Sequence, residues 1–251
     1  MKRALMAASL ATVICANAQA DTLLGLYIGG HIWANQAEGS FGEGATEQAT
    51  FNFDDENQGS YFVALEHPIP LIPNIKISAT TLDTVGSANI ETSFIINGET
   101  FEADSELATT FDTSYVDYTL YYEIFDNDLL TFDLGLTARE LESKIGVIEQ
   151  STLQESDLNV SAILPMLYVN TVIGLPFTGL NVFAQANFIS YDDNSLYDYQ
   201  LGLGYAVVDN LAVDLELTLG YRAVQLKLND IDNLYSDLSF NGVFAGAIVH
   251  F

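Results

Sequence analysis

The feature that most constrains the fold is a strict alternation of side chains over 211–222. Leu, Val and Tyr occupy the odd positions of this stretch, whereas Ala, Asp, Glu, Thr, Gly and Arg occupy the even ones. A period of two places the two sets on opposite faces of one β-strand. A soluble strand turns such an apolar face toward its core, and a membrane-barrel strand turns it toward lipid. The rest of the chain has to decide between these two arrangements.

The first residues indicate secretion. Lys2 and Arg3 precede an apolar run over 4–16, and Ala18-Gln19-Ala20 has the form of a cleavage site. The run is too short to span a bilayer, so we expect residues 1–20 to be a signal peptide and 21–251 a single domain. The only cysteine, Cys15, falls within that peptide. Neither a disulfide nor a cysteine-ligated metal is therefore expected in the mature domain.

The charge balance is strongly acidic. Without Lys2 and Arg3, five basic side chains remain against 34 acidic ones, a formal charge of −29. This argues against nucleic acid as a partner, because phosphate contacts need Lys and Arg. The mean hydropathy is nevertheless +0.21. The charges must therefore be segregated from a large apolar surface.

Similar alternation recurs along the chain and predicts about ten strands, with eight or twelve as alternatives. The expected segments are 22–33, 58–66, 75–82, 114–125, 129–141, 158–172, 180–189, 196–207, 211–222 and 236–251. Residues 158–191 carry no charge and resemble a transmembrane helix in that respect. However, Pro165 and Pro176 would each cost about 3 kcal/mol in a helix interior. Two strands joined by a turn at 173–179, with an irregularity around Pro165, fit this segment better.

The connections between these segments alternate in length. The short ones are 67–74, 126–128, 173–179 and 208–210; the long, acidic ones are 34–57, 83–113 and 142–157, with an extra hairpin expected around Asn97-Gly98. An even strand count with short turns on one side and long loops on the other is typical of bacterial outer-membrane barrels. The predicted fold class is an all-β transmembrane antiparallel barrel in the Gram-negative outer membrane, with short periplasmic turns and long acidic external loops. A soluble β-sandwich or secreted barrel is the alternative.

Four further stretches carry two resemblances. GVFAGAIVHF, which ends on Phe251, looks like the terminal signature that outer-membrane proteins present to the barrel assembly machinery, although Phe240, Phe244 and Ile248 on the other parity suggest a bulge or a partly apolar interior. GLYIGGHIW, with Gly29 and Gly30, together with 61–74 and 164–180, resembles a family of proteobacterial outer-membrane β-barrel proteins named for a Gly-Gly motif near the mature N-terminus. The resemblance covers nearly the whole chain and implies an outer-membrane location. It carries over no activity, substrate or functional residue.

Charged side chains on the polar faces are the candidate lumen network. They comprise seven acids and three bases: Glu66, Lys76, Asp117, Glu123, Asp133, Arg139, Asp198, Asp214, Glu216 and Arg222. A turn centred near Leu71 would place Glu66 opposite Lys76, and a register set by 208–210 would place Arg222 opposite Asp198. The network either plugs the lumen or lines a cation-selective path. A ring of about ten strands is only slightly wider than barrels that side chains fill, which favours the plug.

We therefore expect a structural or surface-interaction barrel, with a small cation-selective, porin-like channel as the alternative. An enzyme is not expected, and a surface hydrolase is the rival class. His67 lies in a Pro-rich turn, His250 is penultimate, and His31 is expected near the external end of the first strand, with no nucleophile motif nearby. No catalytic residue, cofactor or dedicated metal site is predicted. The expected partners are outer-membrane lipid, lipopolysaccharide, the assembly machinery and divalent cations at Asp54-Asp55 and Asp192-Asp193 of the external loops.

Overall fold

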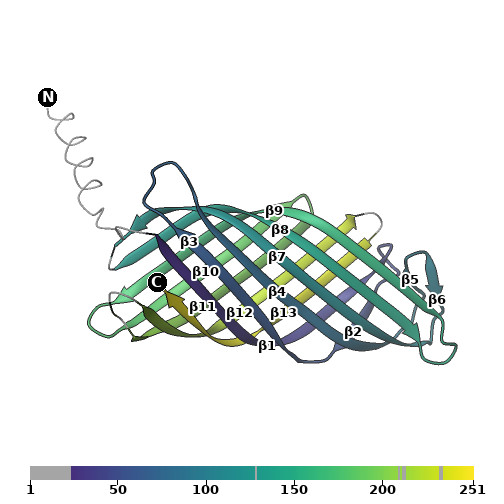
Figure 1. Cartoon of the computed structure of the whole chain (residues 1–251). Helices are drawn as coiled ribbons and strands as arrows, with labels where there is room; N and C mark the ends of the chain where they lie inside the picture. Colours follow the sequence, from purple (N-terminus) through teal and green to yellow (C-terminus); the bar gives the residue numbers. More distant parts are fainter. Residues whose placement is uncertain (1–23, 128, 209, 211–212, 232–233) are drawn as a thin grey trace, which may run out of the picture.

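The computed structural model describes residues 24–251 except 128, 209, 211–212 and 232–233, and it is built from β-strands (Figure 1). The predicted signal peptide, together with Leu211 and Ala212 of the alternating stretch, lies outside the described residues. The strands are β1 (Gly25–Glu43), β2 (Ala49–Phe53), β3 (Glu56–Glu66), β4 (Asn74–Asn89), β5 (Phe94–Ile96), β6 (Glu99–Phe101), β7 (Glu106–Asp126), β8 (Leu130–Glu149), β9 (Glu155–Leu175), β10 (Leu180–Tyr191), β11 (Asn194–Val208), β12 (Asp214–Ile231) and β13 (Leu234–His250).

These strands close into an antiparallel ring. Sequential neighbours pair from β7 to β13, and β13 then pairs with β1 to close the barrel. β2 and β3 both lie between β1 and β4, so together they form one interrupted strand. The ring therefore has ten strand positions, which confirms the predicted fold class and strand number. Within the described residues there is no helix long and apolar enough to cross a membrane.

The two ends of the barrel differ. The turn end holds the connections 67–73 and 176–179, and the cap end holds 44–48, 90–105, 150–154 and 192–193. In Figure 1 the turn end, with the C-terminus, lies at the left, and the β5–β6 hairpin lies at the right. β7 and β9 each have 21 residues, whereas a strand crosses the hydrocarbon core with about 9–11 residues. Roughly half of such a strand therefore extends past the lipid.

The outward side chains show where lipid ends. Along β8 the exposed Leu134 and Leu136 near the turn end give way to exposed Glu140, Glu142 and Lys144 toward the cap end. The belt nearer the turn end consists of exposed apolar and aromatic side chains on many strands: Ile28, Ile32, Tyr61, Val63, Ile75, Ile77, Tyr118, Leu120, Leu134, Leu136, Leu201, Leu203, Leu217, Leu219 and Val243. Such a band is the surface that a membrane barrel presents to hydrocarbon.

The expected long loops are mostly strand. Residues assigned to loops at 34–43, 83–89, 106–113 and 142–149 belong to β1, β4, β7 and β8. The physical reason is a reversal of polarity without a change of period: outward Lys144 is charged, while inward Ile145 and Val147 are apolar and buried. Outside the membrane the strands face water, so the charges move outward and the apolar residues inward. Of the connections at the cap end, 90–105 is the long one.

Two local expectations are confirmed. The hairpin at Asn97-Gly98 forms between β5 and β6, and both residues have positive φ (49° and 74°), as a tight hairpin turn requires. Residues 158–191 form β9, a turn and β10 rather than a helix. β10 pairs with β9 only as far as Leu167, so Pro165 lies where β9 is bonded to β8 alone. A proline is tolerated there because an edge position requires no ladder donor.

Candidate functional site

The ten predicted lumen residues all belong to the inner wall. Nine of them line one interior cavity of about 590 Å³, and Arg139 is 1% exposed beside Asp117. They divide into a buried middle layer, formed by Asp117, Arg139, Asp198 and Arg222, and a set nearer the turn end, formed by Glu66, Lys76, Glu123, Asp133, Asp214 and Glu216. The first set forms ion pairs with one another, while the second is bonded mainly to neutral partners, as described below.

The middle layer is an arginine–aspartate quartet. Arg139 donates from Nε to Asp117 Oδ1 and from Nη2 to Asp117 Oδ2, both at 2.7 Å, and Nη2 also lies 2.7 Å from Asp198 Oδ2. Arg222 donates to both oxygens of the same Asp198, at 3.0 Å from Nε and 2.8 Å from Nη2. Two arginines and two aspartates therefore balance in charge. Such pairing is what makes buried charges tolerable in a barrel interior.

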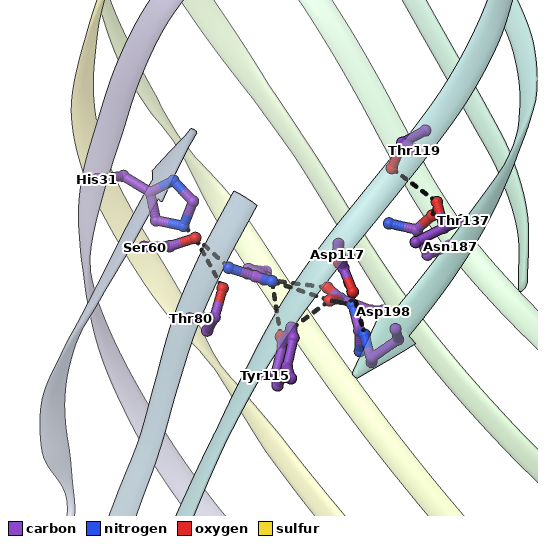
Figure 2. A network of polar contacts seen from close by, with 11 residues as sticks. His31, Ser60, Thr80, Tyr115, Asp117, Thr119, Thr137, Asn187 and Asp198 are labelled. Carbon is purple, nitrogen blue, oxygen red and sulfur yellow. Dashed lines mark hydrogen bonds and ion pairs between the residues drawn. The ribbon is translucent and has the colours of Figure 1, made fainter. Parts of the chain in front are cut away.

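Aromatic and neutral polar groups complete this layer (Figure 2). The Tyr115 hydroxyl donates to Asp198 Oδ2 at 3.0 Å and accepts from Arg222 Nη2 at 2.9 Å, and the Arg139 guanidinium stacks 3.8 Å from the Tyr115 ring centre. Beside it, Thr119 and Thr137 hydroxyls are 2.8 Å apart, and Thr137 donates to Asn187 at 2.7 Å. The quartet is thus embedded in hydrogen-bonding groups from several strands.

The predicted Arg222–Asp198 ion pair is present, but in a different register. β11 and β12 align Gln200 with Arg222 and Asp198 with Val224. Arg222 therefore reaches Asp198 diagonally, two positions along the neighbouring strand, which a long side chain can do. The turn preceding β12 sets an alignment two residues away from the expected one.

The predicted Glu66–Lys76 pairing is wrong. β3 and β4 align Leu65 with Ile75, so Lys76 lies opposite Ala64. Lys76 Nζ instead lies 2.6 Å from the Gln185 amide oxygen across the lumen, and Glu66 accepts from the Tyr121 hydroxyl at 2.7 Å. The proline-containing connection 67–73 shifts this register by two as well.

Amides and one tyrosine hold the acids nearer the turn end. Glu123 accepts from Asn74 Nδ2 at 3.0 Å, Asp133 from Asn170 Nδ2 at 2.8 Å, and Glu216 from Asn181 Nδ2 at 2.6 Å. Glu123 is exposed at the rim, whereas Asp133 is buried. Asp214 lies 3.4 Å from His250 Nδ1. This end of the interior is therefore polar, acidic and open toward the turns.

Toward the cap end the interior is apolar. The cluster includes Phe41, Phe51, Leu82, Phe94, Ile96, Phe101, Leu107, Phe111, Ile145, Val147, Leu238 and Phe240, all buried. Phe240 and Phe244 point inward, which supports the partly apolar interior suggested by their parity. Sequence reasoning missed the rest of this cluster. The signal was available as Leu107 and Phe111 alternating with polar neighbours inside a segment expected to be a loop.

The β5–β6 hairpin lies over this cluster. Its Gly98 amide donates to Oε2 of Glu43, the last residue of β1, at 3.1 Å, and its Ile96 carbonyl accepts from Ser156 Oγ on β9 at 3.0 Å. β1 and β9 are five positions apart in the ring of ten, on opposite sides of the barrel. The hairpin therefore bridges the full width of the mouth, and its side chains Phe94, Ile96 and Phe101 are 0% exposed.

Gly29 and Gly30 have a local structural role. They lie directly opposite Phe62 and Tyr61 on β3. A Cβ on Gly29 would lie 2.7 Å from Phe62 Cζ, and one on Gly30 would lie 2.7 Å from Tyr61 Cδ1. Each glycine is thus covered by the aromatic ring across from it, an arrangement that pins strand register.

The structure places the histidines and the paired acids on different elements of the barrel. His31 lies in the interior, with Nε2 3.1 Å from Arg222 Nη1 and its ring 4.7 Å from that of Phe244. It lies near the start of β1, toward the turn end rather than the cap end of that strand. Asp54 and Asp55 lie between β2 and β3, and Asp192 and Asp193 connect β10 to β11. Across the part of the chain that is described, no group of three His, Cys, Asp or Glu is placed to hold a metal ion.

Comparisons with known proteins identify the fold. No family model and no curated protein matches the sequence. The outer-membrane protease OmpT from Escherichia coli has a similar structure, with a TM-score of 0.53 and 10% identity over 94% of this chain and 99% of that one. The translocator domain of NalP from Neisseria meningitidis gives 0.44 at 11% identity, over 97% and 95%. The AIDA-I transport unit from Escherichia coli gives 0.43 at 8%, over 97% and 95%.

At such identities the similarity to OmpT shows the fold alone, and the two lower scores support no argument. The fold agrees with the apolar belt and the closed antiparallel ring described above. The chain is an integral β-barrel of the bacterial outer membrane.

Proposed function

We propose that this protein is a non-conducting outer-membrane barrel whose cap end, projecting past the lipid, is an acidic interaction surface. The observation that carries the proposal is the β5–β6 hairpin, which bridges β1 and β9 across the mouth. Its buried Phe94, Ile96 and Phe101 join the apolar cluster below it. A hydrated ion finds no replacement for its water shell among such side chains.

A second layer supports closure. Below the cap, the quartet connects β8 to β11 through Arg139 and Asp198, which lie on strands that are not neighbours. Asp198 is 5% exposed and Arg222 is 4% exposed. Two successive layers of different chemistry, one apolar and one ionic, therefore fill the cross-section.

The projecting half supplies the interaction surface. Its outward residues include Glu38, Asp112, Glu140, Glu142 and Asp157, all exposed. Carboxylates facing water can share divalent cations with the phosphates of lipopolysaccharide. We propose lipopolysaccharide, bridged by such cations, as the partner of this surface. We also propose that the chain belongs to the family with the Gly-Gly motif, and that the assembly machinery recognises Phe251.

The alternative is a small cation-selective channel. The observation that favours it is the excess of acids around the 590 Å³ cavity at the turn end. An enzymatic role has less support, because His31 contacts Arg222 and a phenylalanine rather than a nucleophile. We therefore propose that the protein is not a hydrolase.

Planar-bilayer recording with the purified full-length protein tests closure. We expect no steady conductance steps from the wild type, and none after the hairpin residues 93–102 are replaced by a Gly-Ser linker, because the quartet still blocks the interior. Steady cation-selective steps from the wild-type protein would overturn the closed barrel and establish the channel.

Retention on immobilised lipopolysaccharide tests the surface. We expect retention in Ca²⁺, its loss in EDTA, and weaker retention after the double substitution Glu140→Gln and Glu142→Gln. Glu216→Gln, which neutralises an interior acid, is the matched control and should be retained like the wild type. If neither EDTA nor the double substitution changes retention, the outward acids do not bind lipopolysaccharide through divalent cations.

A further inference from the structure

The cavity at the turn end has the properties of a ligand site. Its volume of about 590 Å³ is in the range of small-molecule pockets. Residues at strand ends and turns, such as His67, Pro68 and Val208, form its rim. Its floor is formed by Asp117, Asp198 and Arg222 of the quartet. Access is therefore from the turn end, and occupancy requires no passage through the barrel.

The charge of the cavity is not balanced by the protein. Arg139 and Arg222 pair with Asp117 and Asp198. The other acids that line the cavity are Glu66, Glu123, Asp126, Asp133, Asp214 and Glu216, with Lys76 as the remaining lysine or arginine among the lining residues. Like charges that line one partly enclosed cavity repel one another unless a cation joins them.

One carboxylate that lines the cavity has an oxygen with no hydrogen-bond partner among the described residues. Asp133 is 3% exposed and lines the cavity. Its Oδ2 accepts from Asn170, but its Oδ1 has no hydrogen-bond partner among the described residues. A buried carboxylate oxygen is costly to leave unsatisfied. Asp133 is in electrostatic range of Glu123, Asp126 and Lys76, so its surroundings do not supply a second basic group.

The same wall already holds an ammonium group. Lys76 Nζ lies 2.6 Å from the Gln185 amide oxygen, 4.4 Å from the Phe62 ring centre and 5.8 Å from that of Tyr168. The rings of Tyr121 and Tyr168 are 5.6 Å apart. Aromatic faces beside carboxylates recognise organic ammonium ions. A chelated metal fits less well, because no three metal-binding side chains of the described chain converge.

We propose that this cavity binds a small organic cation with one or more ammonium groups, held at Asp133 Oδ1 between the aromatic wall of Tyr121 and Tyr168 and the rim acids. The ligand neutralises part of the acidic excess and satisfies the open carboxylate oxygen. The proposal goes beyond the closed barrel and does not depend on whether the barrel conducts.

Calorimetric titration of the full-length protein in a zwitterionic detergent tests this inference. The probe is 1,5-diaminopentane, with 1,5-pentanediol as its uncharged counterpart and MgCl₂ as the metal. We expect the diamine to bind, the diol not to bind, and Asp133→Asn to weaken diamine binding at least tenfold. Asp112→Asn, which removes an exposed outward acid of β7, is the matched control and should bind like the wild type.

The outcomes are distinct. Equal diamine affinity in Asp133→Asn and Asp112→Asn overturns the site, and so does the absence of diamine binding to the wild type. Mg²⁺ that displaces the diamine at lower concentration shows a metal site and overturns the organic ligand. If Asp133→Asn does not fold, as judged by heat-modifiable mobility, Glu123→Gln at the exposed rim replaces it, with a loss of affinity supporting the proposal and an unchanged affinity overturning it.

Discussion

Asp117 and Arg139 lie directly opposite each other on β7 and β8, and two parallel hydrogen bonds of 2.7 Å join their side chains. The same guanidinium also contacts Asp198 on β11 at 2.7 Å. β8 and β11 are not neighbours in the ring, so this second contact crosses the lumen. Arg139 thus forms an ion pair with the neighbouring strand and a second one across the barrel interior.

Substituting Arg139 should destabilise the barrel strongly. Arg139→Ala leaves Asp117 without its bidentate partner and Asp198 with one arginine, and breaking a buried pair costs about 3–5 kcal/mol. Urea unfolding in lipid, followed by the fluorescence of the single tryptophan Trp33, measures the loss. Lys144→Ala on the same strand removes an exposed cation and should change stability by less than about 0.5 kcal/mol. Equal effects of the two substitutions would contradict the quartet.

Replacing Gly29 should destabilise the barrel, because the Phe62 ring lies over this glycine. Gly29→Ala pushes a Cβ toward Phe62, 2.7 Å from its Cζ, and overpacking of this kind costs about 1–3 kcal/mol. In a Phe62→Leu background the ring is gone, so the same substitution should cost less than half as much. The four proteins form a double-mutant cycle measured by the same unfolding assay. Additive effects would show that Phe62 is not the reason for the glycine.

The lipid belt on β12 ends between Tyr221 and Gln225. Leu219 is 61% exposed within the belt, whereas Gln225 is exposed past it. Leu219→Arg should therefore cost about 2–4 kcal/mol in bilayers, and Gln225→Arg about 0–1 kcal/mol. Unfolding in phospholipid vesicles compares the two. Similar costs at both positions would place the membrane boundary elsewhere.

Cysteine labelling determines which end faces the cell exterior. The described residues contain no cysteine, so Lys144→Cys, Leu136→Cys and Leu71→Cys each provide a single site in that part of the chain. A charged maleimide should label Lys144→Cys on intact cells, since this position lies past the belt toward the cap end. It should label Leu71→Cys, in an exposed turn, only after the outer membrane is permeabilised, and Leu136→Cys in neither case. Labelling of Leu71→Cys on intact cells would reverse the orientation.

Period-two alternation predicted the strands and the face of every charged lumen residue, because side-chain direction in a strand depends only on parity. Parity does not fix register. Both hairpin registers predicted from turn positions, around Leu71 and 208–210, differ from the structure by two residues. A shift of two keeps each side chain on its face and changes its neighbour, so Glu66 and Lys76 kept their side but not their pairing.

The sequence pattern also did not predict that about half of each long strand projects past the lipid. Alternation continues through 142–149, but the apolar residues Ile145 and Val147 now point inward and Glu142 and Lys144 outward. Charge density there resembles that of a loop, since outside lipid the polarity of the two faces is reversed.

The sequence by itself therefore determined a membrane β-barrel with an acidic interior, because strand periodicity and composition are local properties. Only the tertiary structure decided that Arg139 reaches Asp198 across the lumen, that the β5–β6 hairpin contacts both β1 and β9, and that Asp133 lines a cavity. These depend on closing the ring, which brings together strands far apart in the chain, and no local pattern encodes which of them meet.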